Sequence, residues 1–325
     1  IWHLDFSAAV YRGGSGSLAK WVKTEWERKA IESQYLISQD TAREAAYWAT
    51  SLRLGFRDVQ NATNQRTMIA CLIPGFPCGN TVPILRTGCY STDLGLLTAL
   101  ESFPPDRVLR MKMSQNHVNW FYVSELPIPR YLGMAAMNAA MLRNVSLLTA
   151  AGEQFAPLWL WTGLTSAYGR RWALTHHERL RLRCMLDAIV AELYGLGWDD
   201  LSWILRECDY PADRVQDSAF ARTLDPKGFW RVDKDRDPEL RHTVLTMAAF
   251  RELKEIISSE GDRERGIEAF CAMNGGEGWM LPEALKLADL GLGHDERAKK
   301  VQPVRARLGE RFLPWQLEIT PEESW

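Results

Sequence analysis

The sequence predicts an α+β protein in which short strands come first and helices follow. Residues 1–130 alternate short β-type runs with turn signals, whereas residues 131–325 repeat their apolar residues at helical spacing. The change falls at Leu126-Pro127-Ile128-Pro129, where two prolines interrupt any regular element. A chain of 325 residues is also long enough for two domains of ordinary size. We therefore expect one domain over residues 1–130 and a mainly helical one over residues 131–325.

Four runs in the first domain have the composition of strands, and a glycine-rich turn at Gly13-Gly14-Ser15-Gly16 follows the first of them. The four runs are Ile1–Phe6, Leu52–Val59, Thr67–Ile73 and Val118–Val123. Between the last two, Leu94–Leu100 and Val108–Met113 have helical spacing. Pro104-Pro105 separates them, so we expect a helical hairpin or a broken helix there.

The second domain contains several runs typical of helices. They are Met134–Leu148, a long run from His176 to Leu193, Trp198–Arg206, Glu239–Ile257 and Arg263–Met273. Gly195 follows the long run, where glycine can adopt the left-handed conformation that ends a helix. Asn274-Gly275-Gly276 is expected to end the last helix in the same way.

Composition places the chain among folded proteins and excludes several classes. Hydrophobic residues make up 46% and charged residues 25%, which is typical of a globular protein and not of a disordered one. No window reaches the roughly 18 apolar residues of a membrane helix. The six cysteines are not paired at the spacing of zinc or redox motifs, so we expect free thiols and a cytoplasmic location. The chain begins with Ile1, and we expect it to be part of a longer protein.

The formal net charge of −2 excludes a protein that grips nucleic acid through charge alone. Residues 1–130 carry 14 Lys/Arg against 11 Asp/Glu, whereas residues 201–325 carry 19 against 24. A surface that faces phosphates is therefore expected in the first domain.

Two polar groups in the first domain could bind nucleic acid. The run from Arg57 to Thr67 holds two arginines among short amide and hydroxyl side chains, which suit phosphates and base edges. Asn61, Thr63 and Asn64 could equally close the turn on themselves. The second group precedes the aromatic run Trp120-Phe121-Tyr122, whose rings we expect in the core. It comprises Lys112, Ser114, Gln115, Asn116, His117 and Asn119.

No specific catalytic or metal-binding motif is present in the sequence. Phosphate-cradling Gly-x-x-x-x-Gly-Lys, Gly-x-Ser-x-Gly and His-Glu-x-x-His are all missing. Ser102-Phe103-Pro104-Pro105-Asp106 only imitates an amino-methyltransferase tetrapeptide, which requires Asp, Asn or Ser directly before Pro-Pro and an aromatic residue after it. We expect no metal and no cofactor in this chain.

Four stretches of the chain resemble the C-terminal region of type IIG, BREX and DISARM-like methyltransferases, which are adenine-specific. They are Trp26–Leu36, Leu54–Val59 with Thr63–Ala70, Leu96 through His117–Phe121 to Pro129, and Leu186–Leu196 with Trp203–Leu205. The third stretch is loosely similar to target-recognition domains of type I specificity subunits. Phe103-Pro104-Pro105 departs from the family, which usually continues an apolar helix there.

The resemblance implies a DNA target-recognition domain of a restriction-modification or phage-defence system. The methyltransferase domain, its S-adenosylmethionine and the catalytic tetrapeptide would lie upstream of Ile1, and a flipped adenine would be presented to them. Expected partners are double-stranded DNA, that upstream domain and other defence-system subunits, with no membrane. We expect phosphate contacts from Arg57, Arg66, Arg110 and Lys112, and base contacts from Asn64, Asn116, His117 and Asn119.

Two other hypotheses remain open from the sequence. The helical part could be a docking or scaffold module of a defence complex without its own DNA specificity. Alternatively, the chain could be a complete enzyme that uses His and Asp residues, although no paired nucleophile and base are evident.

Overall fold

The computed structural model describes about two thirds of the chain, in two compact units. Unit one comprises residues 1–47 with 319–325, and unit two comprises residues 48–318. The described residues are 2–5, 20–23, 40, 52–75, 78–85, 87–129, 139–150, 155–163, 173, 176–280, 285–286 and 301–302.

The described residues of unit one include an antiparallel pair of strands, β1 (Trp2–Asp5) and β2 (Lys20–Lys23). This pair confirms the strand predicted near the start of the chain. The glycine-rich turn at 13–16 and the stretch at 26–36 lie outside the described residues.

Unit two contains a three-stranded antiparallel sheet with the most buried strand in the middle. The central strand β3 (Arg53–Phe56) pairs with β4 (Ala70–Ile73) on one side and β5 (Ile84–Leu85) on the other. All four residues of β3 are buried. The strands predicted over 52–59 and 67–73 are confirmed, though shorter. The two-residue β5 has no alternating pattern that sequence reasoning could detect.

Two consecutive helices, α2 (Tyr90–Leu100) and α3 (Phe103–Lys112), confirm the predicted broken helix. The break falls at Ser102 instead of at the prolines. Both prolines lie in the first turn of α3, where backbone N–H groups have no partner within the helix and proline removes nothing.

The strand predicted over 118–123 is wrong, because this segment forms the short helix α4 (Trp120–Ser124). The Asn119 side chain caps it by accepting a hydrogen bond from the Tyr122 N–H. Val118, Tyr122 and Val123 are buried. Val118 precedes the helix, and within it the adjacent Tyr122 and Val123 are buried, although their aromatic and β-branched types favour a strand.

The remaining elements of unit two are mostly helices. In chain order they are α5 (Ala139–Thr149), α6 (Ala156–Trp161), α7 (His176–Leu193), α8 (Trp198–Ile204), α9 (Ala212–Gln216), α10 (Ser218–Ala221), the 3-10 turn η6 (Pro238–Leu240), α11 (His242–Glu260), α12 (Arg263–Gly276), β6 (Leu285–Lys286) and β7 (Val301–Gln302). The predicted glycine end of α7 is confirmed, since Gly195 has a φ of 72°. The last turn of α12 departs from helical geometry from Met273 to Gly275, where the stop was expected.

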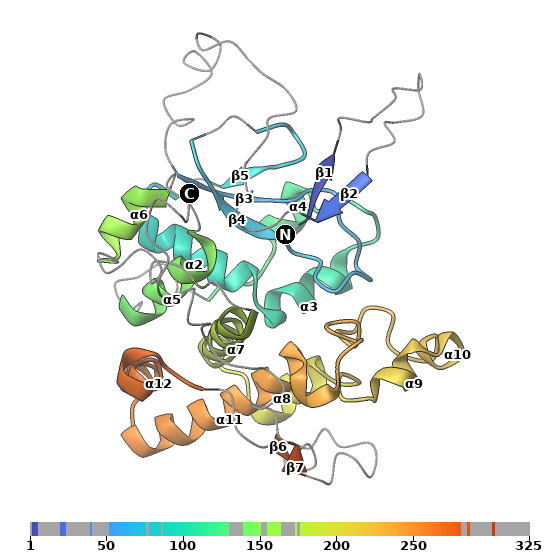
Figure 1. Ribbon diagram of the computed structural model, residues 1–325. Coiled ribbons are helices and arrows are strands. Elements are labelled where there is room, and N and C mark those ends of the chain that lie inside the picture. Colours follow the sequence, from blue (N-terminus) through green and yellow to red (C-terminus); the bar gives the residue numbers. More distant parts are fainter. Residues whose placement is uncertain are drawn as a thin grey trace. The chain divides into compact units, whose positions relative to one another are not determined.

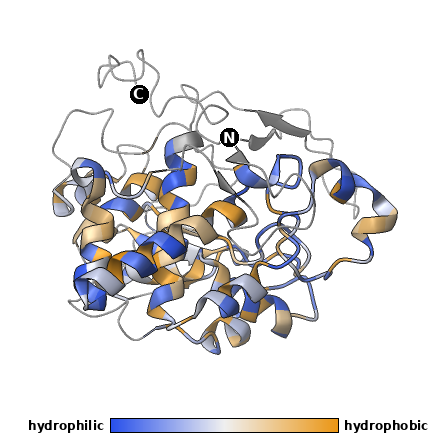
Figure 2. Ribbon diagram, turned by 90° about the horizontal axis from the view of Figure 1, so that it is seen from below, coloured by the Kyte–Doolittle hydropathy of each residue, from blue (hydrophilic) through white to orange (hydrophobic). Residues whose placement is uncertain are grey.

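Helix α7 lies at the centre of the helical packing. It contacts α11 most extensively, and it also contacts α2, α3 and α5 (Figure 1). Every residue of α11 from His242 to Phe250 is buried, and its second half becomes exposed. Figure 2 shows hydrophobic and hydrophilic residues on the same helices, as expected for helices that bury one side. Each fully buried large apolar side chain contributes about 1.5–3 kcal/mol.

The fold is therefore α+β, as predicted. The domain boundary predicted near residue 130 stays a prediction. Helix α3, which precedes this boundary, contacts α7 and α8, which follow it, so the elements on its two sides pack against each other. None of the described helices has both the length and the apolar character needed to cross a membrane. The six cysteines all lie in described residues and form no disulfide bond.

The packing of α11 against α12 requires glycine at position 266. A Cβ atom there would lie 2.7 Å from the Ile257 Cα and 2.5 Å from its Cγ1. Because the first of these is backbone, α12 would have to move. We expect Gly266→Ala to lower the free energy of unfolding by about 1–3 kcal/mol, measured by urea unfolding. Gly79→Ala is the control, since a Cβ meets nothing within 4 Å there. Equal effects of the two changes would contradict this packing.

Candidate nucleic-acid interface

The two polar groups predicted from the sequence lie side by side in the structure. Val59 and His117 form an antiparallel bridge. On either side of it, the Gln60 N–H donates to the Asn116 carbonyl at 3.0 Å and the Val118 N–H donates to the Asp58 carbonyl at 2.7 Å. These backbone bonds hold the loop after β3, residues 57–69, against the loop after α3, residues 113–119, which we call the second loop.

Exposed polar side chains from both loops form one surface, which we call the amide face. It consists of Thr63, Asn64, Gln65, Ser114, Gln115, Asn116, His117 and Asn119. A direct side-chain bond joins the loops, because Asn61 Nδ2 donates to Asn116 Oδ1 at 3.1 Å. Three of the four predicted base-contacting residues, Asn64, Asn116 and His117, therefore lie in joined loops, and Asn119 follows directly.

Several of these side chains also hold the loops themselves. Asn61 Oδ1 accepts from the Thr63 N–H and from the Thr63 hydroxyl, both at 2.9 Å. The turn therefore closes on itself, which was the alternative to nucleic-acid binding in the sequence analysis. Asn64 Nδ2 donates to Gln60 Oε1 at 2.9 Å. His117 Nδ1 lies 2.8 Å from Asp58 Oδ2, although the imidazole is more than half exposed. Asn119 caps α4.

The cations predicted to contact phosphates differ in their exposure to solvent and in their ion-pair partners. Arg57 is exposed, and no carboxylate in the described part of residues 52–129 pairs with it. Lys112 is exposed and pairs with Glu125 at 2.7 Å. An exposed pair of this kind contributes about 0–1 kcal/mol, so Lys112 can exchange its partner easily.

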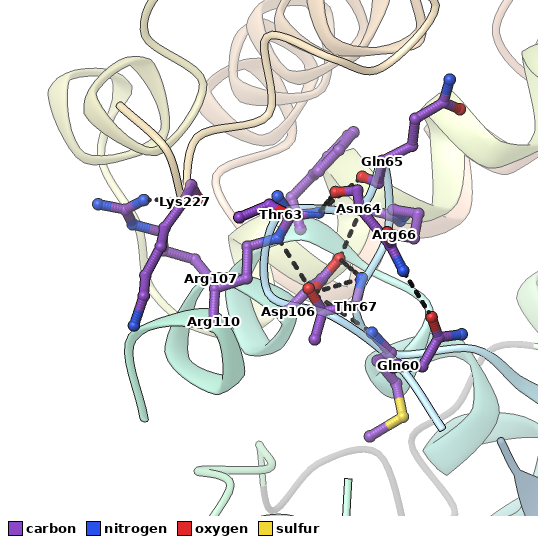
Figure 3. Close-up of polar contacts among 12 residues, drawn as sticks. Gln60, Thr63, Asn64, Gln65, Arg66, Thr67, Asp106, Arg107, Arg110 and Lys227 are labelled. Carbon is purple, nitrogen blue, oxygen red and sulfur yellow. Dashed lines mark hydrogen bonds and ion pairs between the residues drawn. The ribbon is translucent and has the colours of Figure 1, made fainter. Parts of the chain in front are cut away.

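Arg110 is completely buried, which corrects the expectation that it reaches a phosphate. Its guanidinium donates to the carbonyls of Asn64 at 2.8 Å, Gln65 at 2.6 Å and Gly228 at 2.9 Å. Its Nε lies 3.3 Å from Asp106 Oδ1. Arg110 therefore fixes the backbone from which Asn64 and Gln65 extend, and Figure 3 shows Gln65 directed away from these contacts.

Asp106 is the matching buried anion. Its carboxylate accepts from the Thr67 N–H at 3.1 Å and the Met68 N–H at 3.4 Å, in addition to Arg110 (Figure 3). Charge-assisted bonds to a buried carboxylate are stronger than neutral ones. We call Asp106 and Arg110 the buried clamp, because they join the loop after β3, helix α3 and residue 228.

Arg66 is also directed inward, although it was expected at a phosphate. Its side chain is 18% exposed and lies 3.7 Å from Asp187 Oδ1 and 4.0 Å from Asp106 Oδ2. Its guanidinium stacks 4.0 Å over the Phe103 ring and donates to the Glu101 carbonyl. These contacts turn Arg66 toward the core, and a phosphate contact by it has no support in this geometry.

Sequence reasoning missed a second buried group, formed by Asp187 on α7 and His242 on α11. The carboxylate accepts from the Phe103 N–H at 2.8 Å and lies 2.7 Å from His242 Nε2. Burial lowers the pKa of His242, and the neighbouring Asp187 only partly opposes this. The one signal in the sequence was an ionisable residue within each apolar helical run.

Aromatic side chains border the second loop. Trp120 and Phe121 are 48% and 63% exposed, which corrects the expectation that this run lies in the core, whereas Tyr122 is buried. Trp120 packs edge-on against Phe56 of β3, with ring centroids 5.4 Å apart. Exposed aromatic rings beside amides are a surface on which bases can stack.

Comparison with known proteins returned no match. No family model, curated protein or solved structure matches the chain. In the described residues no group of three or more His, Cys, Asp or Glu side chains could hold a metal ion.

The buried clamp should be essential to stability. Asp106→Asn leaves Arg110 as a buried cation without its anion. We expect the free energy of unfolding to fall by about 3 kcal/mol or more in urea titration. Glu125→Gln removes the exposed pair with Lys112 and should cost less than about 1 kcal/mol. Similar losses in the free energy of unfolding for the two variants would show that the buried clamp is no more important to stability than the exposed pair.

Glu101 should make stability depend on pH. Burial raises its pKa to about 7 from an ordinary value of 4.5, against the opposing bond from the Ala70 N–H and the charge of Arg66. Between pH 4.5 and 7 the folded state then binds more protons than the unfolded state, so this contribution falls as pH rises. Glu101→Gln cannot titrate, so its stability relative to wild type should be higher at pH 8 than at pH 5 in urea unfolding. A difference independent of pH would contradict the raised pKa.

Proposed function

We propose that this chain is the DNA target-recognition part of an adenine-specific DNA methyltransferase of a restriction-modification or phage-defence system. The amide face is the observation that carries the proposal. Resemblance to methyltransferase C-terminal regions and, more loosely, to type I specificity subunits adds support.

The chemistry of the amide face suits base edges better than phosphates. Asn and Gln carry a donor beside an acceptor, which matches the N6 and N7 groups of adenine in the major groove. Eight exposed polar side chains come from two loops that backbone bonds and Arg110 hold in place. Reading of bases needs donors whose positions are set in advance, because each ordered side chain otherwise costs entropy.

Charge at the amide face is sparse. Arg57 is exposed, Lys112 is paired with Glu125, and Arg66 and Arg110 lie inward. Phosphate contacts position a protein on DNA but carry no sequence information. We infer that this face supplies specificity, with few phosphate contacts of its own.

The proposed parent enzyme supplies what the chain does not contain. S-adenosylmethionine and the catalytic tetrapeptide belong to the upstream domain in this proposal, and duplex DNA is the shared partner of both parts. Other defence-system subunits are possible partners, and the cytoplasm is the proposed location. Methyl transfer is thus expected of the longer protein only.

Arg57 should contact one phosphate. We expect Arg57→Gln to weaken binding of the chain to a pool of random duplexes, and to lower the slope of log affinity against log salt by about one. Fluorescence anisotropy at several salt concentrations measures both quantities. The loss should be similar for all sequences, since a phosphate contact does not read bases.

Arg251→Gln is the matched control for this experiment. Arg251 is exposed on α11, and its substitution removes the same charge outside the amide face. Equal effects of the two substitutions would remove Arg57 from the interface. No binding to duplex DNA by the wild-type chain, even at low salt, would overturn the proposed recognition function.

A further inference from the structure

An open pocket lies in the helical part of unit two, where the sequence suggested no site. Its volume is about 470 Å³, and residues between Val215 and Lys234 line it. This volume falls in the range of about 300–1,000 Å³ that small-molecule sites occupy. We call it the cationic pocket, because lysine and arginine side chains are among those that line it.

The apolar base of the pocket is a small hydrophobic cluster separate from the main core. Val215, Leu224 and Trp230 form it, each no more than 5% exposed, and Tyr210, Phe220 and Ala221 pack against it. The Trp230 indole is fixed by its Nε1–H, which donates to the Asp225 carbonyl at 2.8 Å. The cluster gives the pocket a rigid lining that can contact the carbon atoms of a ligand.

Three cations line the pocket, and none of its ten lining residues is acidic. The cations are Arg222, Arg231 and Lys234. This contrasts with the surrounding segment, because residues 201–325 carry five more acidic than basic residues. Gln216 and Ser218 add neutral hydrogen-bonding groups to the lining.

Nearby acids bond mainly to groups outside the pocket, although the charge of Asp225 also acts on Arg231. Asp225 binds Arg107 at 3.0 Å and Arg206 at 2.6 Å. Asp233 lies 3.9 Å from Arg236 and accepts from the His242 N–H. Asp235 is exposed and lies 3.5 Å from Gln216 Nε2 at the edge of the pocket. Within residues 176–280, no carboxylate pairs with Arg222 or Lys234.

Arg231 is the cation of the three for which both a ring contact and a hydrogen bond are present. Its guanidinium stacks 3.9 Å over the Trp230 ring, and Nη1 donates to the Pro226 carbonyl at 2.9 Å. A guanidinium is planar, and stacking fixes the orientation of that plane, so its remaining N–H donors can bind two oxygens of one anion. Arg222 and Lys234 add charge, and within residues 176–280 no carboxylate pairs with either.

We propose that the cationic pocket binds a phosphate ester, with Arg222, Arg231 and Lys234 contacting the phosphate oxygens and the apolar base contacting the attached sugar. The phosphate could belong to a free nucleotide or to a DNA strand. This proposal does not depend on the amide face. Lys227, which follows the lining residue Pro226, donates to the carbonyls of Met111 and Met113, so the pocket and the second loop are close neighbours.

Calorimetric titration of the full chain with AMP, and with adenosine as the ligand without phosphate, tests the free-nucleotide source. Anisotropy with a 20-base-pair duplex tests the strand source. Arg222→Gln and Lys234→Gln should each lower the affinity for the true ligand by about tenfold or more, since each removes a charged contact. Arg251→Gln removes an equal charge outside the pocket and should change affinity much less.

These measurements distinguish a free nucleotide from a DNA strand as the source of the phosphate. They also distinguish failure of the phosphate site from failure of the proposed DNA-recognition function. A nucleotide site is identified if the pocket variants lose AMP binding and wild type binds adenosine only weakly. This conclusion holds even if the chain binds no DNA. Loss of duplex affinity alone identifies a strand phosphate. If neither ligand is affected more by the pocket variants than by Arg251→Gln, the phosphate site is overturned. Thermal unfolding by circular dichroism confirms that each variant is folded.

Discussion

The buried clamp is the interaction on which the rest of unit two depends. One carboxylate and one guanidinium, both inaccessible to solvent, join the loop after β3, helix α3 and the segment at residue 228. Two opposite charges are stable there because backbone N–H groups and carbonyls satisfy most of their remaining bonding capacity. A neutral pair of the same size could not bond to so many backbone groups from separate parts of the chain.

The clamp also explains the shape of the loop surface. Arg110 binds the carbonyls of Asn64 and Gln65, so the backbone of the loop is held from below while their side chains remain exposed. A short polar loop without such support would sample many conformations, and each would present a different pattern of donors. Rigidity of the amide face therefore originates in the core.

Much of the fold could be predicted from periodicity. Helices α7, α11 and α12 lie in apolar runs of helical spacing that end at glycine, and β3 and β4 lie in runs of strand composition bounded by turn signals. The helix α4 was missed because Trp120, Phe121 and Tyr122 favour strands, while the cap at Asn119 is a single weak signal. Helices α9 and α10 have five and four residues, too few for a periodic pattern to appear.

The candidate site was predictable in its members but not in its arrangement. Both polar loops were identified as sequences, yet nothing local shows that Val59 lies opposite His117, 58 residues later. The burial of Arg110 could not be predicted from the sequence either. Asp106 lies four residues before it, and that spacing predicts a pair on one helix face. Whether such a pair faces solvent or the core depends on residues 225–229, which approach α3 only in the folded chain.

The distribution of charge has a consequence for recognition. Unit two places two of the four predicted phosphate-binding cations inside, where they order the fold, and leaves an outer surface rich in neutral amides. A surface of this kind can discriminate between bases by hydrogen bonds. It gains little from counterion release, which supplies nearly all of the non-specific affinity of DNA-binding proteins and a large share of the specific affinity. Tight binding then requires cations elsewhere. In the proposals made above, one such contact comes from the cationic pocket and the others come from the proposed methyltransferase domain.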